Sequence, residues 1–234
     1  MSKSEGWSKG YTKETHSSVK KISDAMKNRG VDNFKEWREE AKQSGRIPSS
    51  YPELVKGGDL AELIGVILGD GHIQKFPRTE RLLIFSNASN TGFVERYTTL
   101  VEQVFDKKPT VYKVKGQECV RIGIYQKHIS ERLGIPAGAR KNLDLPVPDW
   151  ILSNNDYVVR YLRGLYEAEG SESHHAATST HKFSFANMNQ SILENVYGLM
   201  AYLGFHPSMD SKRVQLSRKS EVQSAIELLE FRKY

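Results

Sequence analysis

The stretches LIGVILGDG, residues 63–71, and LRGLYEAEG, residues 162–170, decide the fold of this chain of 234 residues. Each is largely apolar and ends in an acidic residue that precedes a glycine. Helices with a stripe of small residues pack backbone to backbone, closer than the usual distance of roughly 8–10 Å. We therefore expect two closely crossed helices that bring Asp70 and Glu169 together at their ends. The small residues recur every fourth position: Ala61, Gly65 and Gly69 in one helix, Gly164 and Ala168 in the other.

Two acids at helix ends need a physical explanation. The C-terminal end of a helix is mildly negative, so Asp70 and Glu169 are unfavourable there unless positive charge lies nearby. Two neighbouring carboxylates also repel each other, and a shared divalent cation with oxygen ligands relieves both problems. One acid before a glycine is ordinarily a surface residue, and one stripe of small residues is ordinarily tight packing. Two such helices on a basic chain favour a metal site.

The chain contains an internal repeat. The segment IFSNASNTGFVERYTTLVEQVF, residues 84–105, aligns with SFANMNQSILENVYGLMAYLGF, residues 184–205, at an offset of 100. The segment RIGIYQK, residues 121–127, aligns with RVQLSRK, residues 213–219, at an offset of 92, because the second hairpin is shorter. Each half therefore reads helix, strand, strand, helix, strand, strand, helix. The residues that coincide include Phe85/Phe185, Asn87/Asn187, Tyr97/Tyr197 and Phe105/Phe205.

The repeat predicts an α+β fold of two tandem αββαββα half-repeats. Their antiparallel sheets are expected to continue one another across a pseudo-twofold axis, with apolar residues inward and polar residues outward. We place a basic extension at residues 1–58, the first half at 59–134, a turn-rich linker at 135–154 and the second half at 155–234.

Composition narrows the classes of function. The formal net charge of +6 favours a polyanionic partner. No run of about 18 apolar residues occurs, so we expect no membrane insertion and a location in the cytoplasm or in an organelle matrix. The single cysteine, Cys119, lies in a strand-like run and favours a packing role over thiol chemistry.

The extension differs from the rest of the chain in its high lysine content. TKETHSSVKKISDAMKN, residues 12–28, has apolar residues at helical spacing with Thr12 or Thr15 as the N-cap, and VDNFKEWREEAKQ, residues 31–43, suits a second short helix. Neither helix can bury much by itself.

The two opening stretches resemble the signature of the LAGLIDADG homing endonucleases in their single-chain form with two motifs, and the resemblance covers residues 59–234. It implies a saddle of two sheets over a long DNA site. It also implies divalent metals at the last acid of each motif, Asp70 and Glu169, with Gly69 and Ala168 beside them counted in the metal site. Glu169 departs from the aspartate of the signature but keeps a carboxylate. Glu167 has only Leu68 as its counterpart, so we do not count it as a ligand.

The resemblance implies further residues around the scissile phosphates. Lys127 and Lys219 match the basic residue that the family places at the end of the last strand of each half, and a lysine there could stabilise developing charge. A plain phosphate contact is an equal alternative for both. Ser89 and Asn189 match polar residues that organise water, and the alternative is that they cap the helix that follows.

Several polar residues are candidates for contacting DNA. Strand alternation leaves Arg213, Gln215, Ser217 and Lys219 on one face, and Arg121 is the counterpart of Arg213; a solvated face is the alternative. The segment 6–27 resembles the small modular DNA-binding motifs attached to intron-encoded nucleases, and a basic disordered arm is the alternative. Its lysines would make phosphate contacts: Lys9, Lys13, Lys20 and Lys21.

The resemblance, together with the basic charge, implies a site-specific, metal-dependent double-strand DNA endonuclease that is intron-encoded, acts as a monomer and hydrolyses a long asymmetric site. Mg²⁺ is the expected cofactor, Mn²⁺ can substitute, and Ca²⁺ is expected to bind without supporting cleavage. The alternative is a nucleic-acid binder that does not cleave, either a maturase acting on its own intron RNA or a transcription regulator.

Overall fold

The computed structural model describes residues 8–30, 34–48, 50–175 and 179–234. The chain forms two compact units, Met1–Tyr51 and Pro52–Tyr234. The segment after Pro52 belongs to the second unit, where Leu54 is buried in the core. Among the described helices, none combines the length and the hydrophobicity needed to span a membrane.

The second unit consists of two halves with the same order of elements. The first comprises α3 (Gly58–Asp70), β1 (Gly71–Phe76), β2 (Thr79–Asn87), α4 (Thr91–Phe105), β3 (Thr110–Lys113), β4 (Cys119–Gln126) and α5 (Ile129–Leu133). After α6 (Asp149–Leu152), the second comprises α7 (Asn155–Glu169), β5 (Gly170–His175), β6 (Thr180–Ala186), α8 (Gln190–Tyr202), β7 (Ser208–Met209), β8 (Arg213–Leu216) and α9 (Lys219–Leu228). The predicted αββαββα order and the α+β class are confirmed.

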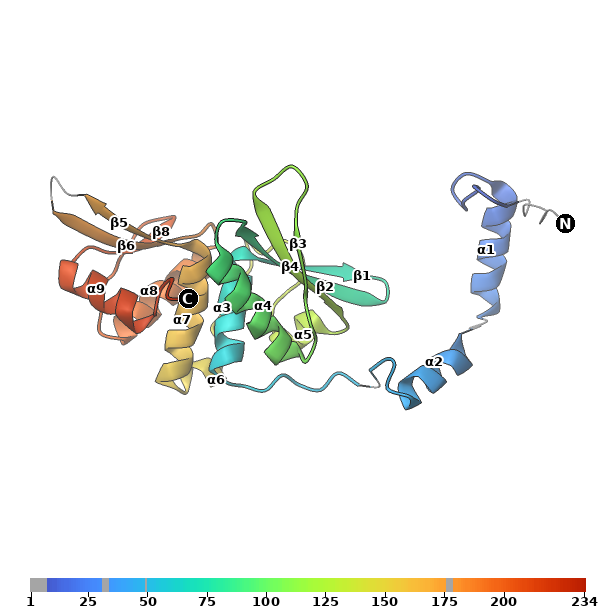
Figure 1. The fold of residues 1–234 in the computed structure, drawn as a ribbon, viewed down its shortest axis with the longest axis horizontal. Helices are drawn as coiled ribbons and strands as arrows, with labels where there is room; N and C mark the ends of the chain where they lie inside the picture. Colours follow the sequence, from blue (N-terminus) through green and yellow to red (C-terminus); the bar gives the residue numbers. More distant parts are fainter. Residues whose placement is uncertain (1–7, 31–33, 49, 176–178) are drawn as a thin grey trace. The chain divides into compact units, whose positions relative to one another are not determined.

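Each half contains one four-stranded antiparallel sheet. The strand order is β1-β2-β4-β3 in the first sheet and β5-β6-β8-β7 in the second, so matched strands occupy matched places. Figure 1 shows the helices gathered on one side of both sheets. Alternate residues such as Ile84 of β2 and Phe185 of β6 are buried on the helix side. Their neighbours along each strand form the opposite side, which we call the open face of that sheet.

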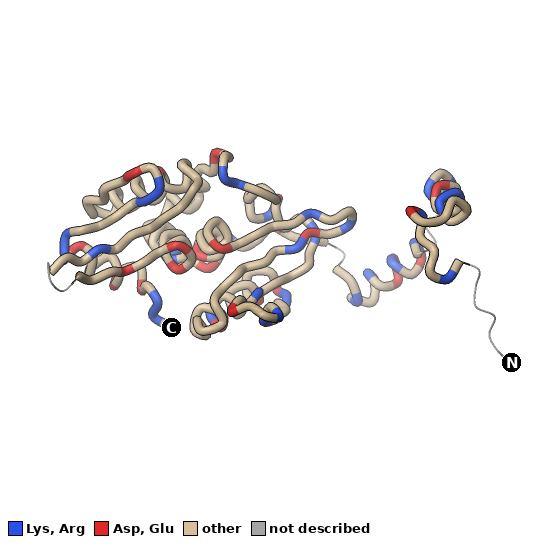
Figure 2. Tube along the Cα trace, turned by 90° about the horizontal axis from the view of Figure 1, so that it is seen from above, with Lys and Arg blue, Asp and Glu red and all other residues tan. Residues whose placement is uncertain are grey.

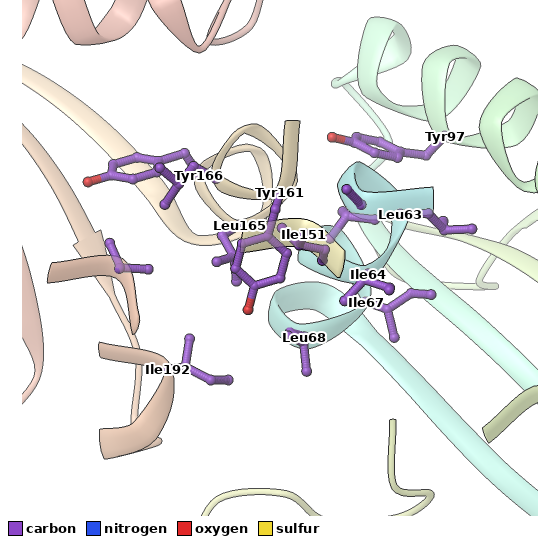
Figure 3. Packing of buried hydrophobic residues seen from close by; sticks show 14 of the residues in the cluster. Leu63, Ile64, Ile67, Leu68, Tyr97, Ile151, Tyr161, Leu165, Tyr166 and Ile192 are labelled. Carbon is purple, nitrogen blue, oxygen red and sulfur yellow. The ribbon is translucent and has the colours of Figure 1, made fainter. Parts of the chain in front are cut away.

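The helices α3 and α7 cross backbone to backbone. A Cβ added to Gly65 would lie 2.2 Å from the carbonyl oxygen of Tyr161, and one added to Gly164 would lie 2.1 Å from that of Glu62. No side chain fits at either crossing position. Larger residues such as Leu63, Ile67 and Leu165 pack around the crossing, as Figure 3 shows. The close crossing predicted from the stripes of small residues is confirmed.

Each of these helices passes directly into a strand. The helix α3 ends at Asp70 and β1 begins at Gly71, and α7 and β5 repeat this arrangement at Glu169 and Gly170. Neither glycine has a positive φ angle, the values being −95° for Gly71 and −82° for Gly170. Each is required by close approach instead, since an added Cβ would lie 2.5 Å from the Cα of Ile67 or 2.3 Å from the carbonyl oxygen of Tyr166.

The first unit contains two short helices, α1 (Ser17–Arg29) and α2 (Lys35–Gln43). The N-cap of α1 is His16, whose ring accepts a hydrogen bond from the Ser18 amide, and not Thr12 or Thr15 as the sequence suggested. The start of the second predicted helix, residues 31–33, lies outside the described residues. Within the described part of the unit, Ala41 is the one buried apolar residue, so this unit has little core of its own.

Candidate functional site

The acids Asp70 and Glu169 lie next to each other at the ends of the crossed helices. A Cβ added to Gly69 would lie 2.4 Å from the Cβ of Ala168 and 3.1 Å from the Cγ of Glu169. Burial, followed by the neighbouring charge of Glu169, raises the pKa of Asp70 to about 7. Burial also raises the pKa of Glu169. The structure thus brings together the two predicted acids with the two small residues beside them.

The surroundings of this pair differ from those of Glu62, a buried acid on the same helix α3. The carboxylate of Glu62 accepts hydrogen bonds from Arg96 at 2.6 Å and Arg160 at 2.5 Å. Burial alone would raise its pKa, but the arginines outweigh burial and hold it below the usual value. Within the described residues, no lysine or arginine forms an ion pair with Asp70 or Glu169. The pair therefore lacks the direct ion pairs that hold Glu62.

The donor set fits a hard divalent cation. Two carboxylates offer oxygen ligands, which Mg²⁺ and Mn²⁺ prefer. The described residues contain no group of three or more histidine, cysteine, aspartate or glutamate side chains able to hold a metal. A cation between Asp70 and Glu169 would thus complete its coordination with water and with oxygen atoms of a substrate, which is the usual pattern for Mg²⁺.

Glu167 does not join this pair. Its carboxylate accepts a hydrogen bond from the Arg232 amide at 2.6 Å and another from the Tyr234 hydroxyl. The side chain is buried against the C-terminal residues of the chain. This agrees with leaving Glu167 out of the predicted ligand set.

The structure does not bring Lys127 and Lys219 to the acids. Gly71, next to Asp70, pairs with Ile84, and Ile84 pairs with Ile122 of β4. Lys127 is five residues beyond Ile122, which corresponds to about 17 Å along an extended strand. It therefore lies beyond the outer end of the sheet, where Gln126 pairs with Glu80.

Lys219 occupies the matching outer place in the second half. The strand β8 ends at Leu216, so Lys219 is not on the strand face where the sequence placed it but is the first residue of α9. It lies near His181 of the outer part of β6, whose pKa is lowered by desolvation and by the charges of His174 and Lys219. Direct contact with the metal site is not supported for either lysine, and the phosphate-contact alternative fits the outer position.

Ser89 and Asn189 have different surroundings despite their matched positions. Both lie in a turn in which the side chain of Asn87 or Asn187 accepts the hydrogen bond from their amide. Ser89 is exposed, and its hydroxyl lies 2.8 Å from the oxygen of Asn87.

Asn189 is buried, and both ends of its side-chain amide have protein partners. Its oxygen caps α8 by accepting from the Ile192 amide, and its nitrogen donates to the carbonyl oxygens of Arg140 and Leu143. The capping alternative is therefore observed for Asn189, and its role in organising water stays a prediction. For Ser89 the water role stays a prediction, and capping is not observed, since the N-cap of α4 is Asn90.

The open face of the first sheet carries arginines held between aromatic rings. The guanidinium of Arg121 lies 5.4 Å from the ring centre of Phe85 and 5.9 Å from that of Tyr112. Arg81 lies 5.6 Å from the ring centres of both Phe76 and Tyr125. Arg81 also donates to Gln74 at 2.6 Å and to the Tyr125 hydroxyl at 3.1 Å. Stacking and hydrogen bonds therefore fix the orientation of Arg81.

The open face of the second sheet carries serines together with Arg213, Gln215 and Lys182. Arg213 and Gln215 alternate with the buried residues Val214 and Leu216, as the sequence predicted. Ser217 is exposed just beyond the strand and accepts a hydrogen bond from Gln215 at 2.8 Å. Register adds Ser171, Ser173, Lys182 and Ser184 to this face. Figure 2, a view from above, shows basic positions along both sheets and acidic positions where the halves meet.

The lysines predicted to contact DNA from the extension are exposed. Lys20 and Lys21 lie on α1, and Lys9 and Lys13 precede it. Lys13 lies 3.5 Å from the carboxylate of Glu14. Their role stays a prediction.

Sequence reasoning missed Arg81 and Gln74. Both lie on the open face, where Gln74 of β1 pairs directly with Arg81 of β2. The alternation in RLLIF, residues 81–85, places Arg81, Leu83 and Phe85 on one side of the strand, and that signal could have identified Arg81. No short-range signal identifies Gln74, since its partner comes from another strand.

Comparison with solved structures defines the class of fold: the chain has the LAGLIDADG fold, with two sheets in a pseudosymmetric arrangement. The homing endonuclease I-DmoI in complex with DNA and Mn is similar with a TM-score of 0.52 and 17% identity, over 74% of this chain and 96% of that chain. The N-terminal LAGLIDADG domain of DUF199/WhiA has a TM-score of 0.51 and 13% identity, over 74% of this chain and 80% of that chain. At these identities the similarity establishes the fold alone.

Sequence comparison adds one partial match. No protein-family model matches the chain. Over 115 residues, or 48% of the chain, it is 31% identical to glutamine–fructose-6-phosphate aminotransferase of Methanocaldococcus jannaschii. The matched part is only 10% of that protein, so the aminotransferase activity does not carry over to this chain.

Proposed function

We propose that this chain is a metal-dependent, site-specific double-strand DNA endonuclease. The observation that carries the proposal is the pair of partly buried acids, Asp70 and Glu169, which lie close together at the ends of the crossed helices without an ion-pair partner among the described residues. Burial and mutual repulsion make this pair costly in the absence of a ligand, as the raised pKa of Asp70 shows. Such a cost is typical of functional sites.

The location of the pair suits a phosphodiester substrate. The acids lie at the junction of the two halves, and each adjoins the first strand of its own sheet. DNA lying across both open faces would place its backbone at this junction. The two faces differ in composition, which supports an asymmetric site. The related structures of I-DmoI, solved with DNA and Mn or with target DNA and Mg, support this substrate and this choice of metals.

The chemistry proposed is hydrolysis of one phosphodiester in each strand. The oxygen of water bonds to phosphorus, the bond from phosphorus to the 3′ oxygen breaks, and a proton passes to the 3′ oxygen. A bound Mg²⁺ or Mn²⁺ would activate the water and stabilise the leaving oxygen. Asp70 and Glu169 would hold and orient the cations. We assign Lys127 and Lys219 to phosphates away from the cleaved bonds.

The finer properties belong to the same proposal. We propose a monomer encoded within an intron, acting in the cytoplasm or in an organelle matrix, with Ca²⁺ binding but not supporting cleavage. Lys9, Lys13, Lys20 and Lys21 would extend the contact with DNA.

The alternative is a nucleic-acid binder that does not cleave, with DNA or its own intron RNA as partner. The fold itself does not decide between the two. The LAGLIDADG domain of DUF199/WhiA, which is not named as an endonuclease, is as similar to this chain as the homing endonuclease I-DmoI. The uncompensated acid pair favours cleavage, because a binder gains nothing from keeping it.

The test is incubation of the full chain with a plasmid library of candidate sites and Mg²⁺, scored for a single double-strand cut. Asp70→Asn and Glu169→Gln should bind the selected site without cutting it. Specific binding without cleavage by the unchanged protein would support the alternative.

A further inference from the structure

Arg140 lies in the connector between the halves, residues 134–148, and bonds to the junction at which α3 ends in Asp70 and β1 begins. Its Nη2 atom donates to the carbonyl oxygen of Ile67 at 2.8 Å and to that of Gly71 at 2.6 Å. One guanidinium nitrogen therefore joins the last turn of α3 to the first residue of β1. Asp70 lies between the two carbonyls that are bridged.

Arg232 makes the corresponding contact in the second half. It follows Arg140 by 92 residues, the same offset that relates Arg121 to Arg213. Its Nη2 atom donates to the carbonyl oxygen of Gly170 at 3.4 Å, and its guanidinium lies 4.7 Å from the ring centre of Phe231. The contact is longer and reaches one carbonyl instead of two. The repeat thus extends beyond the matched strands to a pair of arginines, one at each junction.

These arginines supply positive charge where the helix ends are negative. Carbonyl groups at the end of a helix carry partial negative charge, to which the acids add. Within the described residues, neither arginine forms a hydrogen bond or an ion pair with Asp70 or Glu169. The charge acts through the backbone, so it leaves the carboxylates available for a cation.

The connector links Arg140 to the second half as well. The side-chain nitrogen of Asn189 donates to the carbonyl oxygen of Arg140 at 2.7 Å, while its oxygen caps α8. Arg140 is partly buried, and the structure describes no partner for its Nη1 atom. Burial of this cation is unfavourable, as the lowered pKa of Arg140 indicates.

We propose that Arg140 and Arg232 are positioning residues, each of which holds the acid of its own half in place to bind a divalent cation. This inference rests on the proposed function. Arg140 is the stronger of the two, because its contacts are shorter and bridge both sides of the junction. The two halves would therefore depend unequally on their arginines.

The test compares Arg140→Met and Arg232→Met with Arg132→Met as the matched control. Arg132, in the same half, also donates to a carbonyl oxygen, that of Pro52 at 2.8 Å, but it lies away from the junction. In the complex of full-length protein with its DNA site, Mn²⁺ affinity is measured by calorimetry, and cleavage of each strand is followed separately. Thermal unfolding shows whether each variant is folded.

We expect Arg140→Met to lower Mn²⁺ affinity by about tenfold, as is typical for residues that orient metal ligands. It should slow cleavage of one strand more than the other at unchanged DNA affinity. Arg232→Met should do the same for the opposite strand with a smaller effect. Arg140→Lys, which keeps the charge but not the planar donor group, should restore part of the affinity.

Equal losses in Arg132→Met and Arg140→Met, or unchanged Mn²⁺ affinity in Arg140→Met, would overturn the inference. Equal slowing of both strands by Arg140→Met would also count against it, since a general loss of stability acts on both. If Arg140→Met does not fold, the test rests on Arg140→Lys, which should slow cleavage of one DNA strand more than the other. Failure of the unchanged protein to cleave or to bind Mn²⁺ would instead defeat the proposed function.

Discussion

The open faces of the two sheets have the same backbone and different chemistry. In the first sheet, Arg81 and Arg121 are held between aromatic rings, and Arg81 is further fixed by Gln74. In the second sheet, serines accompany Gln215, and Arg213 and Lys182 supply the positive charge. A repeated unit thus kept its strand order and register while its outward residues diverged. Under the proposed function, we expect base recognition to be divided unequally between the halves.

Rigid arginines and flexible polar residues recognise DNA in different ways. An oriented guanidinium suits bidentate hydrogen bonds to guanine, whereas lysine and serine contribute mainly contacts to phosphate or to several bases. We therefore expect the half of the DNA site that faces the first sheet to be the more strictly specified.

The largest effect is expected for the pair of acids, to which the two halves contribute matching residues. Asp70→Asn or Glu169→Gln should lower the cleavage rate by about 100-fold or more, because the charge stabilisation that a bound metal supplies amounts to several kcal/mol. Binding to the site should be nearly unchanged, as measured by gel shift in Ca²⁺. A parallel loss of binding and cleavage would show that the acids are structural.

The next effect tests the comparison of the faces directly. Arg81→Ala should cost about 1–3 kcal/mol of binding free energy and relax the choice of base at one position. Lys182→Ala on the other face is the control, and should weaken binding to all sites alike. Selection from a randomised site library measures both. Relaxed base choice in the lysine variant, with none in the arginine variant, would reverse the comparison.

The architecture of this molecule could be predicted from the sequence alone. The duplication, the order of helices and strands along the chain, and the crossing of α3 and α7 followed from periodic small residues and from matched segments. Such features can be predicted from the sequence because they lie within one segment or recur at a fixed offset. The acids were located for the same reason, since each ends a recognisable motif.

The residues around the acid pair were harder to predict from the sequence. Lys127 and Lys219 were matched by offset, but Lys127 lies just beyond the end of β4 and Lys219 begins α9, both away from the acids. The sequence left a water-organising role and helix capping open for Asn189, and it did not reveal that this side chain also donates to Arg140 and Leu143. Pairings such as Gln74 with Arg81 depend on contacts between segments, which no local pattern displays.

The extension provides a smaller test, of whether the two faces alone define the site. Removal of residues 1–51, the first compact unit, should weaken DNA binding and reduce the salt dependence by a slope of about 0.9 for each lost phosphate contact. Base choice should stay as it was, and the footprint should shorten. An unchanged footprint with an unchanged salt slope would mean that this unit does not contact DNA.

A change in pH tests the cost of the acid pair. Burial and the charge of Glu169 raise the pKa of Asp70 from 3.8 to about 7 in the folded protein, so the folded state binds more protons than the unfolded state between these values. The unchanged protein should therefore lose stability as the pH rises from about 4 to about 7, each pKa unit being worth about 1.4 kcal/mol at most. In EDTA at pH 8, Asp70→Asn should melt at a higher temperature than the unchanged protein.

Two controls sharpen this measurement. At pH 4 the difference between the two proteins should nearly vanish, because Asp70 is then protonated in the folded state. Adding Mn²⁺ at pH 8 should raise the melting temperature of the unchanged protein more than that of the variant. A variant that is less stable at pH 8 would show that the carboxylate of Asp70 contributes to folding.

The smallest effects are expected for Lys127 and Lys219, and they complete the comparison of the halves. Both lie at the outer end of their sheet, so each should contact a phosphate and neither should assist the chemical step. Changing either to Met should lower the slope of log affinity against log salt by about 1, with little change in base choice. The cleavage rate at saturating protein should stay within about twofold of the original, as measured by single-turnover kinetics. A rate reduced by more than tenfold at an unchanged salt slope would restore a catalytic role. Equal effects from the two lysines would mean that the halves share their backbone contacts and differ mainly in how they read bases.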